Sequence, residues 1–207
     1  MPVIVVANPK GGVGKSTLST NLAGYLARQG HAVMLGDTDR QQSTRAWLGL
    51  RPAAAPRIQT WDIAHDHVVK PPKGVTHVVL DTPAGLHGKR LDEIMKLADR
   101  VLVPLQASIF DIYATRDFIA ELLARKKHER VQLAVVGNRV RENTIAADQL
   151  QAFLAQLGVP VLGHLRDTQN YVHLAARGLT LWDVAPGRFE RDLAQWEPIT
   201  RWAGAAA

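Results

Sequence analysis

The chain has 207 residues, of which 46% are hydrophobic, so it is long and apolar enough for one domain with a sizeable core. It contains no cysteine, which excludes disulfides, Cys-bound zinc and iron–sulfur clusters, and no apolar stretch is long enough to predict a membrane span. Lys and Arg number 25 against 19 Asp and Glu, and the resulting net charge of +6 favours contact with polyanions, either nucleic acid or an anionic membrane.

Short β-branched runs alternate with helical patterns along the whole chain. Strands are expected at 3–7, 31–35, 76–80, 100–105, 131–137 and 159–165. Helices are expected at 15–29, in a short stretch through Trp47, and at 89–98, 111–128, 144–157, 169–177 and 189–203. Between them, residues 50–74 contain several prolines and glycines, which predict irregular surface structure.

Strands that alternate with helices are typical of parallel βαβ units with right-handed crossovers. The sequence therefore predicts an α/β fold with a doubly wound, mostly parallel sheet and helices on both faces, formed by a single domain over residues 1–207. Ligands of such sheets bind at the carboxyl ends of the strands. A glycine-rich loop, an acidic pair, a further aspartate and an asparagine follow four of the expected strands, so these groups are expected at one edge.

The glycine-rich loop lies between the first strand and the first helix and spans residues 8–17. Asn8 and Pro9 are followed by Lys10-Gly11-Gly12-Val13-Gly14-Lys15-Ser16-Thr17. The end of a phosphate-binding loop is matched by Gly14-Lys15-Ser16, although Pro9 stands where the strict pattern has its first glycine. The glycines let backbone N–H groups approach phosphate oxygens, and the following helix points its positive end at them. Lys15 is expected to contact the β- and γ-phosphates of ATP, and the Ser16 hydroxyl to bind Mg²⁺. These features predict a P-loop NTPase.

Carboxylates follow two of the strands. Asp37 and Asp39 close the second strand, where two carboxylates two residues apart are suited to face a bound water and a metal. Asp81 closes a buried strand, and in P-loop ATPases such an aspartate holds Mg²⁺ through water. Ser16 and Asp81 are thus the expected metal-binding residues.

Lys10 is a second lysine in a loop that already contains Lys15. With it, residues 10–17 resemble the ParA/MinD family of deviant Walker A ATPases, whose pattern K-G-G-x-G-K-[S/T]-T they match at every position. The resemblance implies that Lys10 is the signature lysine, which reaches across a dimer interface to the ATP of the partner subunit. It also implies that Asp39 acts in water activation while Asp37 supports the metal shell.

Other segments extend the resemblance over nearly the whole chain. Pro83 and Gly85 match the family's D-x-P-x-G switch loop, which senses the γ-phosphate, and the segments 166–171 and 175–180 resemble the family's C-terminal part. Asn138 and Arg139 stand where an asparagine of the family meets adenine. One departure is Arg40, which replaces a common proline after Asp39 and leaves the motion of that loop open.

Within the family, the chain resembles the small ParA type without an N-terminal helix-turn-helix. This resemblance implies a cytoplasmic, nucleoid-associated ATPase that forms an ATP-dependent homodimer and binds DNA without sequence specificity. It implies weak hydrolysis until a ParB-like or other small partner stimulates it, in a cycle that segregates plasmid or chromosome DNA or positions another cargo. Candidate DNA-contacting residues are Arg125, Lys126, Lys127, Arg130, Arg188, Arg191 and Arg201.

Two alternatives stay open at this point. A MinD-like protein would end in an amphipathic membrane helix, and Phe189, Leu193, Trp196 and Trp202 would form its apolar stripe. The polar face of this segment mixes acidic residues with arginines, which favours packing on the domain over membrane binding. A P-loop ligase of the dethiobiotin synthetase type would share the fold, but it would not need Lys10.

Overall fold

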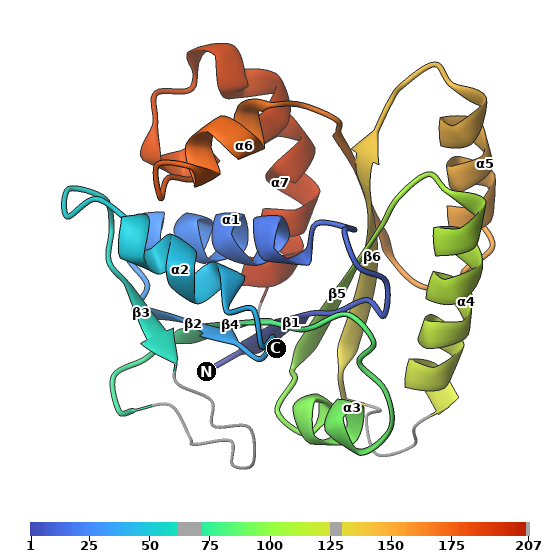
Figure 1. Cartoon of the computed structure of the whole chain (residues 1–207), viewed down its shortest axis with the longest axis horizontal. Helices are drawn as coiled ribbons and strands as arrows, with labels where there is room; N and C mark the ends of the chain where they lie inside the picture. Colours follow the sequence, from blue (N-terminus) through green and yellow to red (C-terminus); the bar gives the residue numbers. More distant parts are fainter. Residues whose placement is uncertain (62–71, 125–129, 206–207) are drawn as a thin grey trace.

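The computed structural model describes residues 1–61, 72–124 and 130–205, which form one seven-stranded sheet covered by helices (Figure 1). The strand order is β3-β2-β4-β1-β5-β6-β7, and every neighbouring pair is parallel. The strands are β1 (Val3–Val6), β2 (Val33–Asp37), β3 (Ile58–Trp61), β4 (His77–Asp81), β5 (Arg100–Leu105), β6 (Gln132–Val140) and β7 (Val161–Arg166).

Helices cover both faces of the sheet, as the alternation of patterns predicts. They are α1 (Lys15–Arg28), α2 (Ser43–Leu50), α3 (Gly88–Met95), α4 (Ile109–Ala124), α5 (Ile145–Leu154), α6 (Asn170–Ala175) and α7 (Glu190–Gly204), with short 3-10 turns at Leu181–Asp183 and Gly187–Phe189. Helices α1, α2, α6 and α7 lie on one side, and α3, α4 and α5 on the other (Figure 1). None of the described helices is both long and apolar enough to cross a membrane.

The centre of the sheet is apolar on both faces. In β1, Val3 and Val5 belong to the core under α3, α4 and α5, whereas Ile4 and Val6 belong to the core under α1 and α7. The chain adds β2 and β3 on one side of β1, returns through β4, and then adds β5, β6 and β7 on the other side. The winding therefore changes direction beside β1, where ligands of such sheets bind.

Two sequence expectations about strands were wrong. The stretch 50–74 contains β3, which pairs with β2 through Val33↔Ile58 and three further residues, although the segment was expected to be irregular. Only Ile58 and Trp61 of this edge strand are buried, so its hydrophobic pattern is minimal. Strand β6 also continues to Val140 instead of ending at Gly137, with register shifts near its end and a positive φ of 52° at Arg139.

The C-terminal helix packs on the domain, as the sequence predicts. Trp196, Ile199 and Ala203 are buried, and Leu193 and Trp202 pack against the same core cluster. Pro198 lies inside α7. The apolar stripe that a MinD-like reading would place in a membrane is thus largely covered by the protein.

Candidate nucleotide site

The phosphate loop connects the buried strand β1 to the first turn of α1. Gly12 and Gly14 have φ angles of 78° and 90°, a region that residues with a side chain rarely adopt. At Gly14 space is limiting as well, because an added Cβ would lie 2.1 Å from Nδ2 of Asn138. That same Nδ2 donates a hydrogen bond to the Val13 carbonyl at 2.7 Å. The conformation of the loop and the position of Asn138 therefore depend on each other.

Side chains from neighbouring elements hold the loop. Asn8 is fully buried, and its Nδ2 donates to the Pro104 carbonyl at 2.7 Å and to Thr115 Oγ1 at 2.9 Å, while its Oδ1 accepts from the Lys10 N–H at 2.8 Å. Gln106 Nε2 donates to the Gly12 carbonyl at 2.9 Å. Sequence reasoning placed Asn8 in the loop without giving it a role, and it missed Gln106. A polar amide directly after a buried strand was the available signal for Asn8.

Lys15 is the buried lysine of the loop. It is 8% exposed, and its Nζ donates to the Lys10 carbonyl at 2.8 Å. Burial lowers the pKa of the Lys15 ammonium, and the negative charges of Asp81 and Asp39 only partly oppose this shift. An anion bound in the loop would stabilise the buried cation, so Lys15 fits the phosphate contact predicted for it.

Asp81 lies at the end of β4, facing the start of α1. Burial raises the pKa of its carboxyl to about 7, although a hydrogen bond from Ser16 opposes the shift. Ser19 Oγ donates to its Oδ1 at 3.2 Å. Hydroxyl and carboxylate oxygens are the ligands that Mg²⁺ prefers, and a divalent cation would favour the ionised carboxylate. Ser16 and Asp81 thus fit a magnesium site, and Ser19, one turn after Ser16, was missed.

The two acidic residues after β2 have different environments. Asp37 is buried, and its carboxylate accepts hydrogen bonds from Thr44 N, Thr44 Oγ1 and Asp39 N at 2.8, 2.8 and 2.9 Å. These contacts fix the start of α2. Asp39 is partly exposed, and its Oδ1 accepts from the Gln41 N–H at 3.0 Å. Asp37 is therefore committed to local structure, while Asp39 is the carboxylate with more freedom to meet a ligand or water.

Lys10, unlike Lys15, extends away from the loop toward α4. Its side chain is 40% exposed, and its Nζ lies 4.0 Å from Oδ1 of Asp111 in the first turn of α4. An ion pair of this kind, at the limit of contact and partly solvated, is weak. Exposed apolar side chains adjoin Asp111 in the sequence of α4, namely Ile109, Phe110 and Tyr113.

A cavity of about 570 Å³ lies beside the loop and contains the residues predicted to meet the base. Thr17, Asn138 and Arg139 form one part of its wall. The other part comes from the C-terminal segment and consists of Arg166, Asp167, Thr168, Gln169, Tyr171, Val172, Ala175 and Ala176. The structure thus brings the glycine-rich loop, the end of β6 and the segment before α6 around one space.

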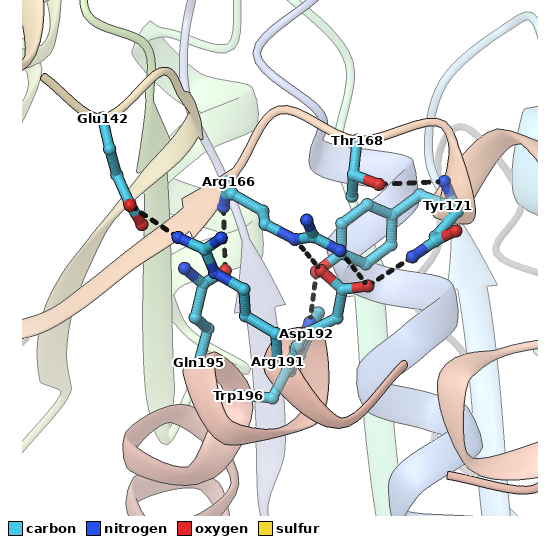
Figure 2. A network of polar contacts seen from close by, with 9 residues as sticks. Glu142, Arg166, Thr168, Tyr171, Arg191, Asp192, Gln195 and Trp196 are labelled. Atoms are coloured by element: carbon cyan, nitrogen blue, oxygen red, sulfur yellow. Dashed lines mark hydrogen bonds and ion pairs between the residues drawn. The ribbon is translucent and has the colours of Figure 1, made fainter. Parts of the chain in front are cut away.

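A polar network holds the C-terminal wall of this cavity on α7 (Figure 2). Arg166 makes two hydrogen bonds to the carboxylate of Asp192, at 2.5 and 3.1 Å, and its backbone N–H donates to Gln195 Oε1 at 2.9 Å. Trp196 Nε1 donates to the Tyr171 hydroxyl at 2.9 Å. Asp192 is fully buried, so the network replaces its hydration. The wall is therefore rigidly joined to the core.

Comparison with known proteins places the chain in a family. Residues 4–181 match the CobQ/CobB/MinD/ParA nucleotide binding domain. The chain belongs to this family. It is 30% identical over 198 residues to maintenance of carboxysome distribution protein A of Halothiobacillus neapolitanus, covering 91% of each chain. It is 28% identical over 173 residues to protein ParA of Rhizobium radiobacter, covering 78% of this chain and 76% of that one.

Solved structures of the family have the same fold. The cell division protein MinD of Aquifex aeolicus superposes with a TM-score of 0.77 at 20% identity, covering 100% of this chain and 98% of that one. The predicted α/β fold of a P-loop NTPase is thus confirmed. The residues predicted for the site lie at one edge of the sheet, and the roles assigned to them stay predictions.

Proposed function

We propose that this chain is a ParA-like positioning ATPase, which binds ATP, forms a closed dimer and hydrolyses ATP when a partner stimulates it. The observation that supports this most is the division between two lysines of one loop. Lys15 is buried and turned into the loop, whereas Lys10 is only half-buried and extends out of the loop toward Asp111 of α4. A loop that serves only its own nucleotide needs Lys15 alone, so the outward lysine favours action on a second subunit.

Each residue of the site has a proposed part. Backbone N–H groups of residues 11–17 and the Lys15 ammonium bind the phosphates, and Asn138 and Arg139 border the adenine. Ser16 and Asp81 hold Mg²⁺, which would neutralise phosphate charge when bound. Asp39 orients the attacking water, while Asp37 keeps the loop and α2 in place.

The dimer would form across the edge that bears Lys10. Phe110 is 75% exposed and Tyr113 is 51% exposed, although both are large apolar side chains. They lie on the first turns of α4, on either side of Asp111, whose carboxylate is 4.0 Å from the Lys10 ammonium. A face-to-face contact of two identical copies would cover these side chains and release Lys10 toward the other subunit.

Light scattering with and without ATP tests the dimer. Wild-type protein is expected to double its mass with ATP, and Lys10→Ala to stay monomeric while still binding nucleotide, because the loop and Lys15 remain. Lys89→Ala is a matched control, since Lys89 is exposed on α3. A Lys10→Ala protein that dimerises like the wild type would contradict the proposed role of Lys10. If the chain were a ligase of the dethiobiotin synthetase type, Lys10→Ala would likewise have little effect.

DNA is the proposed surface on which the dimer acts, in the cytoplasm at the nucleoid. Of the predicted contact residues, Arg191 pairs with Glu142 and Arg201 with Glu197, both at 2.6 Å, and Arg188 lies over the Phe189 ring. Arg130 is exposed, and residues 125–127 lie outside the described part of the chain. The carboxylates partly neutralise Arg191 and Arg201, so these two arginines attract phosphates less. Arg130 and Arg188 are the remaining candidates in the described part of the chain.

Binding to unrelated DNA duplexes and to anionic liposomes, compared with ATP, ADP and no nucleotide, tests this step. The protein is expected to bind DNA with ATP but not with ADP or without nucleotide. The affinity for DNA should fall steeply with salt, because phosphate contacts release counterions. Binding to liposomes without binding to DNA would favour the MinD-like alternative. Equal DNA binding with ATP and ADP would exclude a nucleotide switch. The cargo, whether DNA or a protein complex, would be identified through the small partner that stimulates hydrolysis.

A further inference from the structure

Thr38, the residue between the two aspartates after β2, makes hydrogen bonds to two other elements. Its N–H and its hydroxyl both donate to the Asp81 carbonyl, at 3.1 and 3.0 Å. Its own carbonyl accepts a hydrogen bond from Nη2 of Arg90, which lies on the first turn of α3. The peptide unit that leads into Asp39 is therefore held at its carbonyl by a guanidinium from another element, and at its N–H by Asp37 Oδ1 at 2.9 Å.

Helix α3 is joined to the phosphate loop by the segment 82–87. This segment leaves β4 at Asp81, its Thr82 hydroxyl donates to the Val6 carbonyl at 2.9 Å, and its Gly85 N–H donates to the Pro9 carbonyl at 2.7 Å. It thus lies against the start of the phosphate loop and continues into the helix that bears Arg90. A displacement of the segment would reach the peptide before Asp39 through Arg90.

We propose that Arg90 is a positioning residue for Asp39. The inference rests on the proposed role of Asp39 in orienting water. Arg90 is partly buried, and its contact is a charge-assisted hydrogen bond to a backbone carbonyl, which is stronger than a neutral one. By fixing the plane of the peptide 38–39, it fixes the direction in which the Asp39 carboxylate leaves the chain.

The loop keeps its other supports when Arg90 is removed. Thr38 retains its two bonds to the Asp81 carbonyl, and Asp37 retains three accepted hydrogen bonds. The fold and the phosphate loop should therefore survive, while the peptide that leads into Asp39 loses the contact at its carbonyl and keeps only the bond from its N–H to Asp37. The rate of a reaction falls steeply when a catalytic group is misplaced, even where substrate binding is unchanged. The loss should fall on the rate of hydrolysis and not on the affinity for ATP.

Single-turnover ATP hydrolysis and ATP affinity, measured on the full chain, test the proposal. Arg90→Ala is expected to lower the hydrolysis rate about tenfold or more, with an ATP dissociation constant within about twofold of wild type. Arg90→Lys should recover only part of the rate, because an ammonium lacks the planar fork of donors. Lys89→Ala, which removes a neighbouring exposed charge, should leave both quantities unchanged.

The outcomes separate this proposal from the proposed function. An unchanged rate in Arg90→Ala, or a rate loss matched by an equal loss of ATP affinity or by a large fall in melting temperature, would overturn the positioning role alone. A wild-type protein that binds ATP but hydrolyses none, even in multiple-turnover assays over hours, would overturn the ATPase function and this inference with it.

Discussion

Two regions of the molecule differ in how far their buried charges are compensated by opposite charges within the chain. In the C-terminal part of the fold, Asp183 and Asp192 have buried carboxylates, and each accepts two hydrogen bonds from an arginine, Arg51 and Arg166 respectively. At the phosphate loop, Lys15 hydrogen-bonds a backbone carbonyl, and burial outweighs the attraction of nearby carboxylates in setting its pKa. The first region is electrostatically complete within the chain. The second is incompletely compensated within the chain, as expected of a region that is proposed to bind phosphate and magnesium.

The comparison separates charges that stabilise the fold from charges that bind a ligand. Removing the partner of a paired buried charge destabilises the fold. An incompletely compensated buried charge already lowers stability in the free protein, and a ligand of opposite charge removes this loss when it binds. Substitutions in the first region should therefore lower stability with little effect on ATP, and those in the second should do the reverse.

The largest expected effect is at Arg51. Its guanidinium lies 2.8 Å from Asp183, with side-chain exposures of 6% and 1%, and it also donates to the carbonyls of Pro56 and Gly178. Arg51→Ala leaves Asp183 buried without its cation and should lower the free energy of unfolding by about 3–5 kcal/mol, measured by urea titration.

The control for Arg51 is the exposed pair of Arg116 and Asp117, whose side chains are 56% and 71% exposed. Arg116→Ala should change the free energy of unfolding by no more than about 1 kcal/mol. Equal losses of unfolding free energy in the two variants would show that burial does not determine the contribution of these ion pairs, and would contradict the difference between the two regions.

Lys15→Met is expected to lower ATP affinity without lowering stability, the reverse of Arg51→Ala. The apolar chain keeps the packing of the lysine stem but removes the ammonium that compensates phosphate charge, so ATP affinity should fall by about 100-fold or more in a nucleotide titration. Without nucleotide, the variant should be at least as stable as the wild type, because a buried cation is gone. A variant that binds ATP normally would contradict our assignment of the loop.

A smaller effect is expected at Tyr171, which borders the cavity but belongs to the structural network. Tyr171→Phe leaves the buried Trp196 N–H without its acceptor and should lower the free energy of unfolding by about 1–2 kcal/mol. ATP affinity should stay within about twofold. A larger change in affinity than in stability would mean that the hydroxyl contacts the nucleotide.

Much of this arrangement could be predicted from the sequence, because its determinants are local. The glycine-rich loop, its strand and its helix are contiguous, and Asp37 and Asp81 follow apolar runs that are strands in the structure. Strand β3 was missed because only Ile58 and Trp61 of its four residues face the core, and its partner β2 is distant in the sequence.

Contacts between distant elements could not be predicted in the same way. The pairing of Arg51 with Asp183 joins residues 132 positions apart, and that of Arg90 with Thr38 joins residues 52 apart. A single arginine in a helical pattern is ordinarily a solvated surface charge. Nothing in the local sequence distinguishes Arg90 from the exposed Lys89 beside it.

The smallest expected effect is a pH dependence outside both regions, at His77. Burial, helped by the neighbouring His31, the N-terminus and Arg100, lowers the pKa of His77 to about 4. The unfolded chain, with a His pKa near 6.5, then binds more protons between pH 6.5 and 4, so the folded state loses stability as pH falls through this window. Because His77 is partly exposed, the contribution should be only about 1 kcal/mol.

His77→Gln should therefore flatten the fall in melting temperature between pH 6.5 and 4, while leaving the melting temperature at pH 8 nearly unchanged. His173→Gln serves as a control on an exposed histidine of α6. An equally steep fall in the His77→Gln protein would show that other groups govern its acid sensitivity.

Strand β7 is the last strand of the sheet, and its backbone has consequences for association between copies. Unpaired N–H groups on such an edge can pair with a strand of another molecule and start aggregation. At Arg166 the Gln195 side chain takes the place of that foreign strand by accepting the backbone N–H. Gln195→Leu would leave this donor free, and its first symptom should be concentration-dependent precipitation.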